Sequence, residues 1–164
     1  MRKFLVIFAL IIAPALYAET EVRFHDFPWG TSLQEFKAKM GNPVFVEEVD
    51  GLQSLVYDKL IVSGYPVFML VYFSKNGLEG GTYYFHTFSL EELMKCYKDL
   101  QKELLEKYGP TNLRDEIIKE MRPYETSWEN LKNGYIYLKV NTRQNEPVTL
   151  WYSSPALTEK LTGR

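Results

Sequence analysis

The chain has 164 residues, of which 46% are hydrophobic and 24% charged, a composition typical of one compact domain and too apolar for a disordered chain. Lysine and arginine total 19 against 21 aspartate and glutamate residues, so the formal charge of −2 gives no general cationic surface and we expect no nucleic-acid partner. A single cysteine and two histidines exclude an intrachain disulfide, cysteine-rich zinc sites and multi-histidine metal centres. We therefore expect no cofactor and no metal.

The first 18 residues have the pattern of a secretory signal peptide. Two basic residues precede an unbroken apolar run of ten residues from Phe4 to Ala13. This run is shorter than the ~20 residues that a membrane-spanning helix needs. We predict cleavage after Ala18, which leaves 19–164 as a single globular domain that is periplasmic or secreted and has no stable membrane anchor. An uncleaved anchor is the alternative, because Leu16 occupies a position where a smaller residue is usual.

A short helix is predicted near the start of the mature chain. Ser32 and Glu35 fit the capping box, in which the serine side chain accepts a backbone amide of the first turn. Gly41 and Pro43 end the helix, since glycine readily adopts the left-handed closing conformation and proline cannot continue the helix. Trp29, just before the helix, is expected to anchor the start of the domain by packing.

The segment after this helix is expected to contain four strands, preceded by a solvated loop. Glu47, Glu48 and Asp50 lack the alternating oxygen ligands of a calcium loop, so we assign them to that loop. The predicted strands are Ser54 to Tyr57, Leu60 to Val62, Pro66 to Phe73 and Leu78 to His86.

Two features of these strands predict how they pair and pack. The Asn76-Gly77 pair indicates a hairpin between the last two strands, and Gly80-Gly81 indicates a bulge. Pro66 to Phe73 is apolar at nearly every position, which predicts a central strand covered on both faces. On this interpretation Phe68 and Tyr72 belong to the core.

A second, longer helix is predicted from Ser89 to Gly109. Ser89 and Glu92 repeat the capping box, and Gly109-Pro110 repeats the stop. We expect Cys96 to be a part-buried thiol within it. Its apolar stripe consists of Leu90, Leu93, Met94, Tyr97, Leu100, Leu104, Leu105 and Tyr108.

The rest of the chain is predicted to form a charged connector and three strands. The connector is 112–124, in which Asp115 to Met121 could form a helix. The strands are Thr126 to Glu129, Tyr135 to Asn141 and Pro147 to Ser153, with a turn at Asn133-Gly134. Ser153 to Pro155 is expected to be the exit from the last strand.

The two halves of the chain repeat the same order of elements. We predict an α+β fold made of tandem α-β-β-β repeats, about 27–86 and 87–155, whose antiparallel sheet has its helices packed on one face.

Gly30 to Phe36, followed by Met40 to Pro43, resembles the short helix that opens the SmpA/OmlA group of small envelope proteins, a component of outer-membrane protein assembly. Tandem copies of such a unit also resemble the β-lactamase inhibitor protein architecture. The resemblance implies a small secreted envelope protein whose partner is another envelope protein.

No catalytic constellation is evident among the residues that could carry one. His25 lies beside Asp26 in the segment that begins the mature chain, where adjacent side chains point apart. His86 ends a predicted strand, where a capping or surface role is expected. We therefore predict no catalytic residue and a protein that is not an enzyme.

One cluster of aromatic side chains is the candidate for binding. Period-two alternation places Tyr135 and Tyr137 on the face opposite the aliphatic residues of their strand, and Trp151 on the same side of the next one. Together they would form a partner-binding surface, because tyrosine and tryptophan commonly anchor interfaces. The alternative is that the other half of the chain or a loop covers them.

These observations favour a non-enzymatic, soluble periplasmic protein that binds another protein in envelope maintenance. A carrier of a small apolar ligand and a small hydrolase with an unrecognised site are the alternatives.

Overall fold

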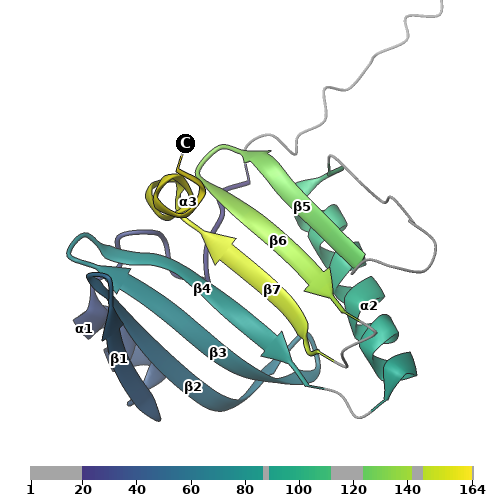
Figure 1. Ribbon diagram of the computed structural model, residues 1–164, viewed down its shortest axis with the longest axis horizontal. Helices are drawn as coiled ribbons and strands as arrows, with labels where there is room; N and C mark the ends of the chain where they lie inside the picture. Colours follow the sequence, from purple (N-terminus) through teal and green to yellow (C-terminus); the bar gives the residue numbers. More distant parts are fainter. Residues whose placement is uncertain (1–19, 87–88, 112–123, 142–145, 164) are drawn as a thin grey trace, which may run out of the picture.

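The computed structural model describes residues 20–86, 89–111, 124–141 and 146–163, which form an α+β fold (Figure 1). Its three helices are α1 (Leu33–Met40), α2 (Leu90–Tyr108) and α3 (Pro155–Thr162). Its strands are β1 (Phe45–Val49), β2 (Leu52–Val62), β3 (Tyr65–Ser74), β4 (Gly77–Phe85), β5 (Tyr124–Leu131), β6 (Gly134–Val140) and β7 (Val148–Ser153). They form one seven-stranded antiparallel sheet in the order β1-β2-β3-β4-β7-β6-β5.

Three predictions fall outside the described residues: the signal peptide at 1–18, most of the connector at 112–124, and the helix at 115–121. None of the helices described is both long and apolar enough to cross a bilayer.

The predicted helix caps of α1 and α2 are confirmed. Ser32 accepts the backbone amide of Glu35 at 3.1 Å, and Ser89 accepts that of Glu92 at 3.2 Å. α1 ends at Gly41 with φ 82° and α2 at Gly109 with φ 81°, a left-handed conformation that favours glycine.

The long helix α2 supplies much of the apolar cover on one face of the sheet. Its buried residues are Leu93, Cys96, Tyr97, Leu100, Leu104 and Tyr108. Leu90, predicted to join this stripe, is instead 54% exposed in the first turn. The Cys96 side chain is fully buried, more than the part-burial expected, and burial raises the pKa of its thiol to about 12.

The edge strand β1 was not predicted from the sequence. Glu47 and Glu48 lie within it and are exposed, whereas the sequence interpretation assigned them to a loop. The sequence of β1 shows no alternation of buried and exposed positions, because its apolar residues Phe45 and Val46 are exposed as well, at 55% and 43%. An edge strand with no buried face carries no period-two signal.

The helix α3 was also missed, and the expectation of a simple strand exit at Ser153 to Pro155 was wrong. Ser154 caps α3 by accepting the amide of Leu157 at 3.1 Å, Pro155 occupies the first turn, and Gly163 closes the helix with φ 66°. These are ordinary start and stop signals on a helix of eight residues, too short to show an apolar period.

The sequence predicted that all helices pack on one face of the sheet, and this prediction was wrong. In Figure 1, α1 and α2 lie behind the sheet, and α3 is seen nearly end-on in front, beside the end of β7. A β-carbon on Gly81 would strike the ring of Phe24, and one on Gly80 would strike the side chain of Leu157 in α3. Since neighbouring strand residues point to opposite faces, Phe24 and α3 lie on opposite sides of β4.

The prediction that β3 is covered on both faces was wrong as well. Its buried side chains alternate, and they are Val67, Met69, Val71 and Phe73. Phe68 lies on the other face and is 44% exposed. The continuous apolar run therefore arises because apolar residues also occupy the open face of β3. It does not indicate a second covering layer.

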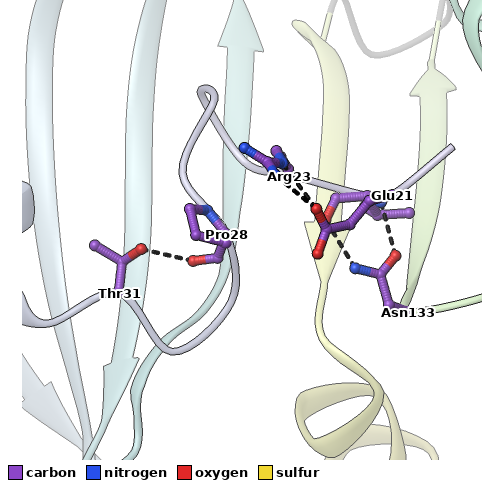
Figure 2. A network of polar contacts seen from close by, with 6 residues as sticks. Glu21, Arg23, Pro28, Thr31 and Asn133 are labelled. Atoms are coloured by element: carbon purple, nitrogen blue, oxygen red, sulfur yellow. Dashed lines mark hydrogen bonds and ion pairs between the residues drawn. The ribbon is translucent and has the colours of Figure 1, made fainter.

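The segment that precedes α1 connects the β5–β6 turn to the central strand β4 (Figure 2). The side chain of Asn133, in the β5–β6 turn, accepts the amide of Val22 at 2.7 Å and donates to its carbonyl at 3.3 Å. Trp29 packs against the core, as expected, and donates its indole N–H to the carbonyl of Asn133 at 2.6 Å. The segment then pairs with β4, where the amide of Gly30 donates to the carbonyl of Leu78 at 2.9 Å.

Replacing Gly81 by alanine tests the close packing on β4. The new methyl group meets the fully buried ring of Phe24, so Gly81→Ala should lower the free energy of unfolding in urea by about 2–3 kcal/mol. Gly64→Ala is the control, because Gly64 has a positive φ of 81° and no neighbouring atom within 4 Å. The control should lose about 1 kcal/mol from backbone strain alone. Equal losses in the two variants would contradict the proposed packing.

Candidate functional site

The face of the sheet opposite α1 and α2 carries a continuous transverse row of side chains, here called the open-face row. Strand register aligns one residue from each of the seven strands, Phe45, Val56, Leu70, Thr82, Trp151, Tyr137 and Ser127. With neighbouring strands ~4.8 Å apart, this row is about 29 Å long. It is apolar or aromatic over most of its length, although it lies on the side away from the main core.

The structure brings Tyr135, Tyr137 and Trp151 together on this face. Ile136 and Leu138, which alternate with the two tyrosines, are fully buried on the other side of β6, whereas the three aromatic residues are half-buried. The rings of Tyr135 and Tyr137 are stacked with centroids 6.4 Å apart, and the rings of Tyr135 and Trp151 meet edge to face at 5.8 Å. Whether they bind a partner stays a prediction.

Two grooves open on this face, one on each side of α3. The first, here called the aromatic groove, has a volume of about 390 Å³. Its floor includes Tyr72, Tyr84, Tyr137 and Trp151, and its wall is formed by Leu157 and Leu161 of α3.

The second groove, of about 690 Å³, lies between α3 and the β5–β6 hairpin and includes Tyr135, Glu129 and Glu159. Trp151 lines both grooves, so it is the residue that they share.

Hydrogen bonds hold α3, which forms this wall, at its start and near its end. The carboxylate of Glu79, buried in the β3–β4 hairpin, accepts hydrogen bonds from the hydroxyls of Ser154 at 2.5 Å and Ser74 at 2.8 Å. At the other end of α3, Lys160 Nζ donates to the carbonyl of Asp50 in the β1–β2 turn at 2.8 Å. α3 is therefore held to the β3–β4 hairpin and to the β1–β2 turn.

The polar atoms of the aromatic groove belong to uncharged groups. Burial raises the pKa of Tyr72 and of Tyr137, and a hydrogen bond to Glu125 raises the pKa of Tyr137 further. Burial also raises the pKa of Tyr135. These phenols remain protonated at neutral pH, and none of the described side chains that line the aromatic groove carries a charge. The groove is therefore suited to an uncharged ligand surface.

Several residues of this site were not predicted from the sequence. Phe68 and Tyr72 were assigned to the core, Tyr84 was not singled out, and Leu157 and Leu161 lie on the unpredicted α3. The signal for Tyr72 was present, because it alternates with the buried residues Val71 and Phe73.

Neither histidine is among the described residues that line the two grooves. His25 Nδ1 is 2.9 Å from the hydroxyl of Tyr83, on the core side of the sheet. The ring of His86 lies 5.6 Å from that of Phe68, and His86 is exposed. Among the described residues, no three histidine, cysteine, aspartate or glutamate side chains gather as a metal site would require. The prediction that the protein is not an enzyme remains a prediction.

No family model and no curated protein matches this sequence. Two solved structures are similar to the chain at low identity. A cysteine-rich secretory protein from Staphylococcus aureus is 13% identical with a TM-score of 0.46, and the match covers 78% of this chain and 44% of that one. An extracellular protein containing an SCP domain from Bacillus anthracis is 13% identical with a TM-score of 0.43, covering 77% and 44%. This chain thus spans less than half the length of either protein.

The resemblance to the SmpA/OmlA group and to the β-lactamase inhibitor protein architecture was wrong. The structures found to be similar are a cysteine-rich secretory protein and an SCP-domain protein, and no family model matches. The residues that suggested the resemblance, chiefly Ser32, Gly41 and Pro43, form the start and stop of a short helix. Such signals recur wherever a short helix must begin and end, so they do not identify a family.

The half-buried position of His25 predicts a pH dependence of stability. Burial lowers the pKa of its imidazole below the usual 6.5, and the charge of Asp26 partly opposes this shift. The unfolded chain therefore binds a proton more readily than the folded one, so the free energy of unfolding should fall as the pH drops below about 6.5. His25→Gln should lose less stability than the wild type between pH 7.5 and pH 5.5, measured by urea unfolding. Identical losses would show that His25 does not contribute.

Proposed function

We propose that the protein is a non-enzymatic binding protein that holds a segment of another envelope protein against the open face of its sheet. The observation that carries this proposal is the open-face row, with grooves on both sides of α3. A soluble monomer rarely leaves so long an apolar stripe without a binding partner. Trp151 lies next to the central position of the row and Tyr137 follows it on the next strand, and both are residue types that commonly anchor interfaces.

The proposed place of action is the periplasm or the exterior of the cell. The signal peptide at 1–18 would direct export, with cleavage after Ala18, and the product 19–164 would act in envelope maintenance. The basic start and the short apolar run support this proposal.

A duplicated helix–strand unit, about 27–86 and 87–155, is proposed as the origin of the fold. Its support is the similar capping of α1 and α2 and a strand order in which β2-β3-β4 mirrors β5-β6-β7 about the β4–β7 pair. In this proposal α3 is an addition to the second copy.

A carrier of a small apolar molecule is the second candidate. The aromatic groove, at about 390 Å³, falls within the ~300–1,000 Å³ of typical small-molecule sites. Native mass spectrometry of the purified mature chain separates the two functions, because a carrier would retain a small molecule and a protein-binding module would not.

The proposed function is tested by crosslinking the envelope of cells that express the chain and weighing what co-purifies. In the double variant Tyr137→Ser, Trp151→Ser, recovery of the partner should fall at least about tenfold, since aromatic interface anchors commonly contribute ~2 kcal/mol or more each. Tyr124→Ser is the matched control, because Tyr124 is 42% exposed and its ring lies 6.1 Å from Tyr97 of α2, on the opposite face. The control should capture the partner normally.

Urea unfolding and circular dichroism must show that both variants fold. Undiminished capture by a folded double variant would contradict the proposal, as would the absence of any partner under crosslinking. Loss of folding in the double variant would assign the two residues to the core instead.

A further inference from the structure

The strand β1 forms one edge of the sheet and exposes apolar side chains on both of its faces. It pairs only with β2, so about half of its backbone N–H and C=O groups point away from the sheet. Three consecutive apolar residues here, Val44, Phe45 and Val46, are exposed. Figure 1 places α1 behind the sheet, and these exposed side chains show that it leaves the edge uncovered. β1 can therefore accept a further strand.

The two faces of β1 carry the same pattern, one apolar side chain followed by one acidic side chain. Phe45 and Glu47 lie on the open face of the sheet, where Phe45 begins the open-face row. Val46 and Glu48 lie on the other face, since Val46 is paired with the fully buried Leu55. A strand added along β1 would meet two apolar residues and then two acidic ones.

The two carboxylates of β1 have no counterion. Glu47 and Glu48 are exposed, and neither forms an ion pair within the part of the chain that the structure describes. The residues opposite them on β2 are the uncharged Ser54 and Gln53. Lys160, which reaches the adjoining turn, donates to a backbone carbonyl there. A partner strand with cationic side chains at these two positions would form charge pairs, and opposite charges directly across a strand pair stabilise it.

A second copy of β1 does not match this edge. No lysine or arginine lies between Lys39 and Lys59, so no register of β1 against itself brings a cation to Glu47 or Glu48. In the antiparallel register that pairs all five residues of the strand, Glu47 would face its own equivalent and Val46 would face Glu48. Like charges directly opposite each other destabilise a strand pair. The chemistry of the edge therefore favours a different polypeptide.

We propose that β1 binds an extended cationic segment of another polypeptide as an added antiparallel strand. From its N-terminus, this segment has two basic residues opposite Glu48 and Glu47, followed by two apolar residues opposite Val46 and Phe45. Backbone hydrogen bonds to the free edge supply affinity, and the four side-chain pairs supply specificity. The proposal concerns the edge of the sheet and goes beyond the binding proposed for the open face.

The test titrates the ¹⁵N-labelled chain, 19–164, with the acetylated and amidated peptide Gly-Ser-Lys-Arg-Val-Ile-Ser-Gly. The backbone amide signals of β1 should shift and saturate, and those of β5, the opposite edge, should stay in place. The control is the same sequence reversed, which keeps the charge but places apolar residues opposite the two acids. It should bind about tenfold more weakly, because both charge pairs and both apolar pairs are lost.

Exchanging the charges gives a second test. The double variant Glu47→Lys, Glu48→Lys should bind the basic peptide at least about tenfold more weakly, because two attractive pairs become repulsive. The same variant should bind an acidic peptide, in which glutamate replaces both basic residues, more tightly than the wild type does. Both side chains are exposed, so the variant should fold, and circular dichroism checks this.

The proposal is overturned if the β1 signals do not move at millimolar basic peptide, if the reversed peptide binds equally, or if the charge exchange does not reverse the preference. Movement of the Trp151 indole signal in place of the β1 signals would put the peptide on the open face and also overturn it. A dimer of the peptide-free chain that shifts the β1 signals would assign the edge to a second copy, with the same consequence. The open-face proposal is decided separately, by crosslinking and the Tyr137→Ser, Trp151→Ser double variant.

Discussion

Close packing on both sides of Gly80 and Gly81 is the constraint on which the rest of the structure depends. These adjacent residues lie in β4, which pairs with β7 and so joins the two halves of the sheet. Gly81 leaves room for the ring of Phe24 on one face, and Gly80 leaves room for Leu157 of α3 on the other. A β-carbon at either position would displace one of these groups. The two glycines thus hold the segment before α1 and the helix α3 against opposite sides of the same strand.

The position of α3 determines what the open face can do. The row from Phe45 to Ser127 crosses the open face, and α3 forms a wall beside it with one groove on each side. The buried carboxylate of Glu79 holds the start of this wall through Ser154. Trp151 lies at the foot of the wall and lines both grooves, so a ligand on either side of α3 can contact it.

The elements that the sequence predicted correctly are those with strong local signals. Ser32 and Ser89 cap their helices as expected, and the alternation along β6 placed Tyr135 and Tyr137 on the face away from Ile136. β1 and α3 escaped prediction because one is an exposed edge and the other is a single short capped helix, so neither shows an apolar period. Tyr72 and Phe68 were misplaced since an apolar residue on an open face looks the same in sequence as one in a core. The candidate site was therefore predicted in part, through β6 and β7, and its half on β3, β4 and α3 required the tertiary structure.

Binding through the open face is tested most directly by placing a photo-crosslinking amino acid at single positions in living cells. Position 84 lies in the floor of the aromatic groove, and position 98 lies on the exposed side of α2. If the open face holds a partner, irradiation should yield a crosslinked protein adduct from position 84 and none from position 98. Adducts from position 98 alone, or equal adducts from both, would contradict a partner held on the open face.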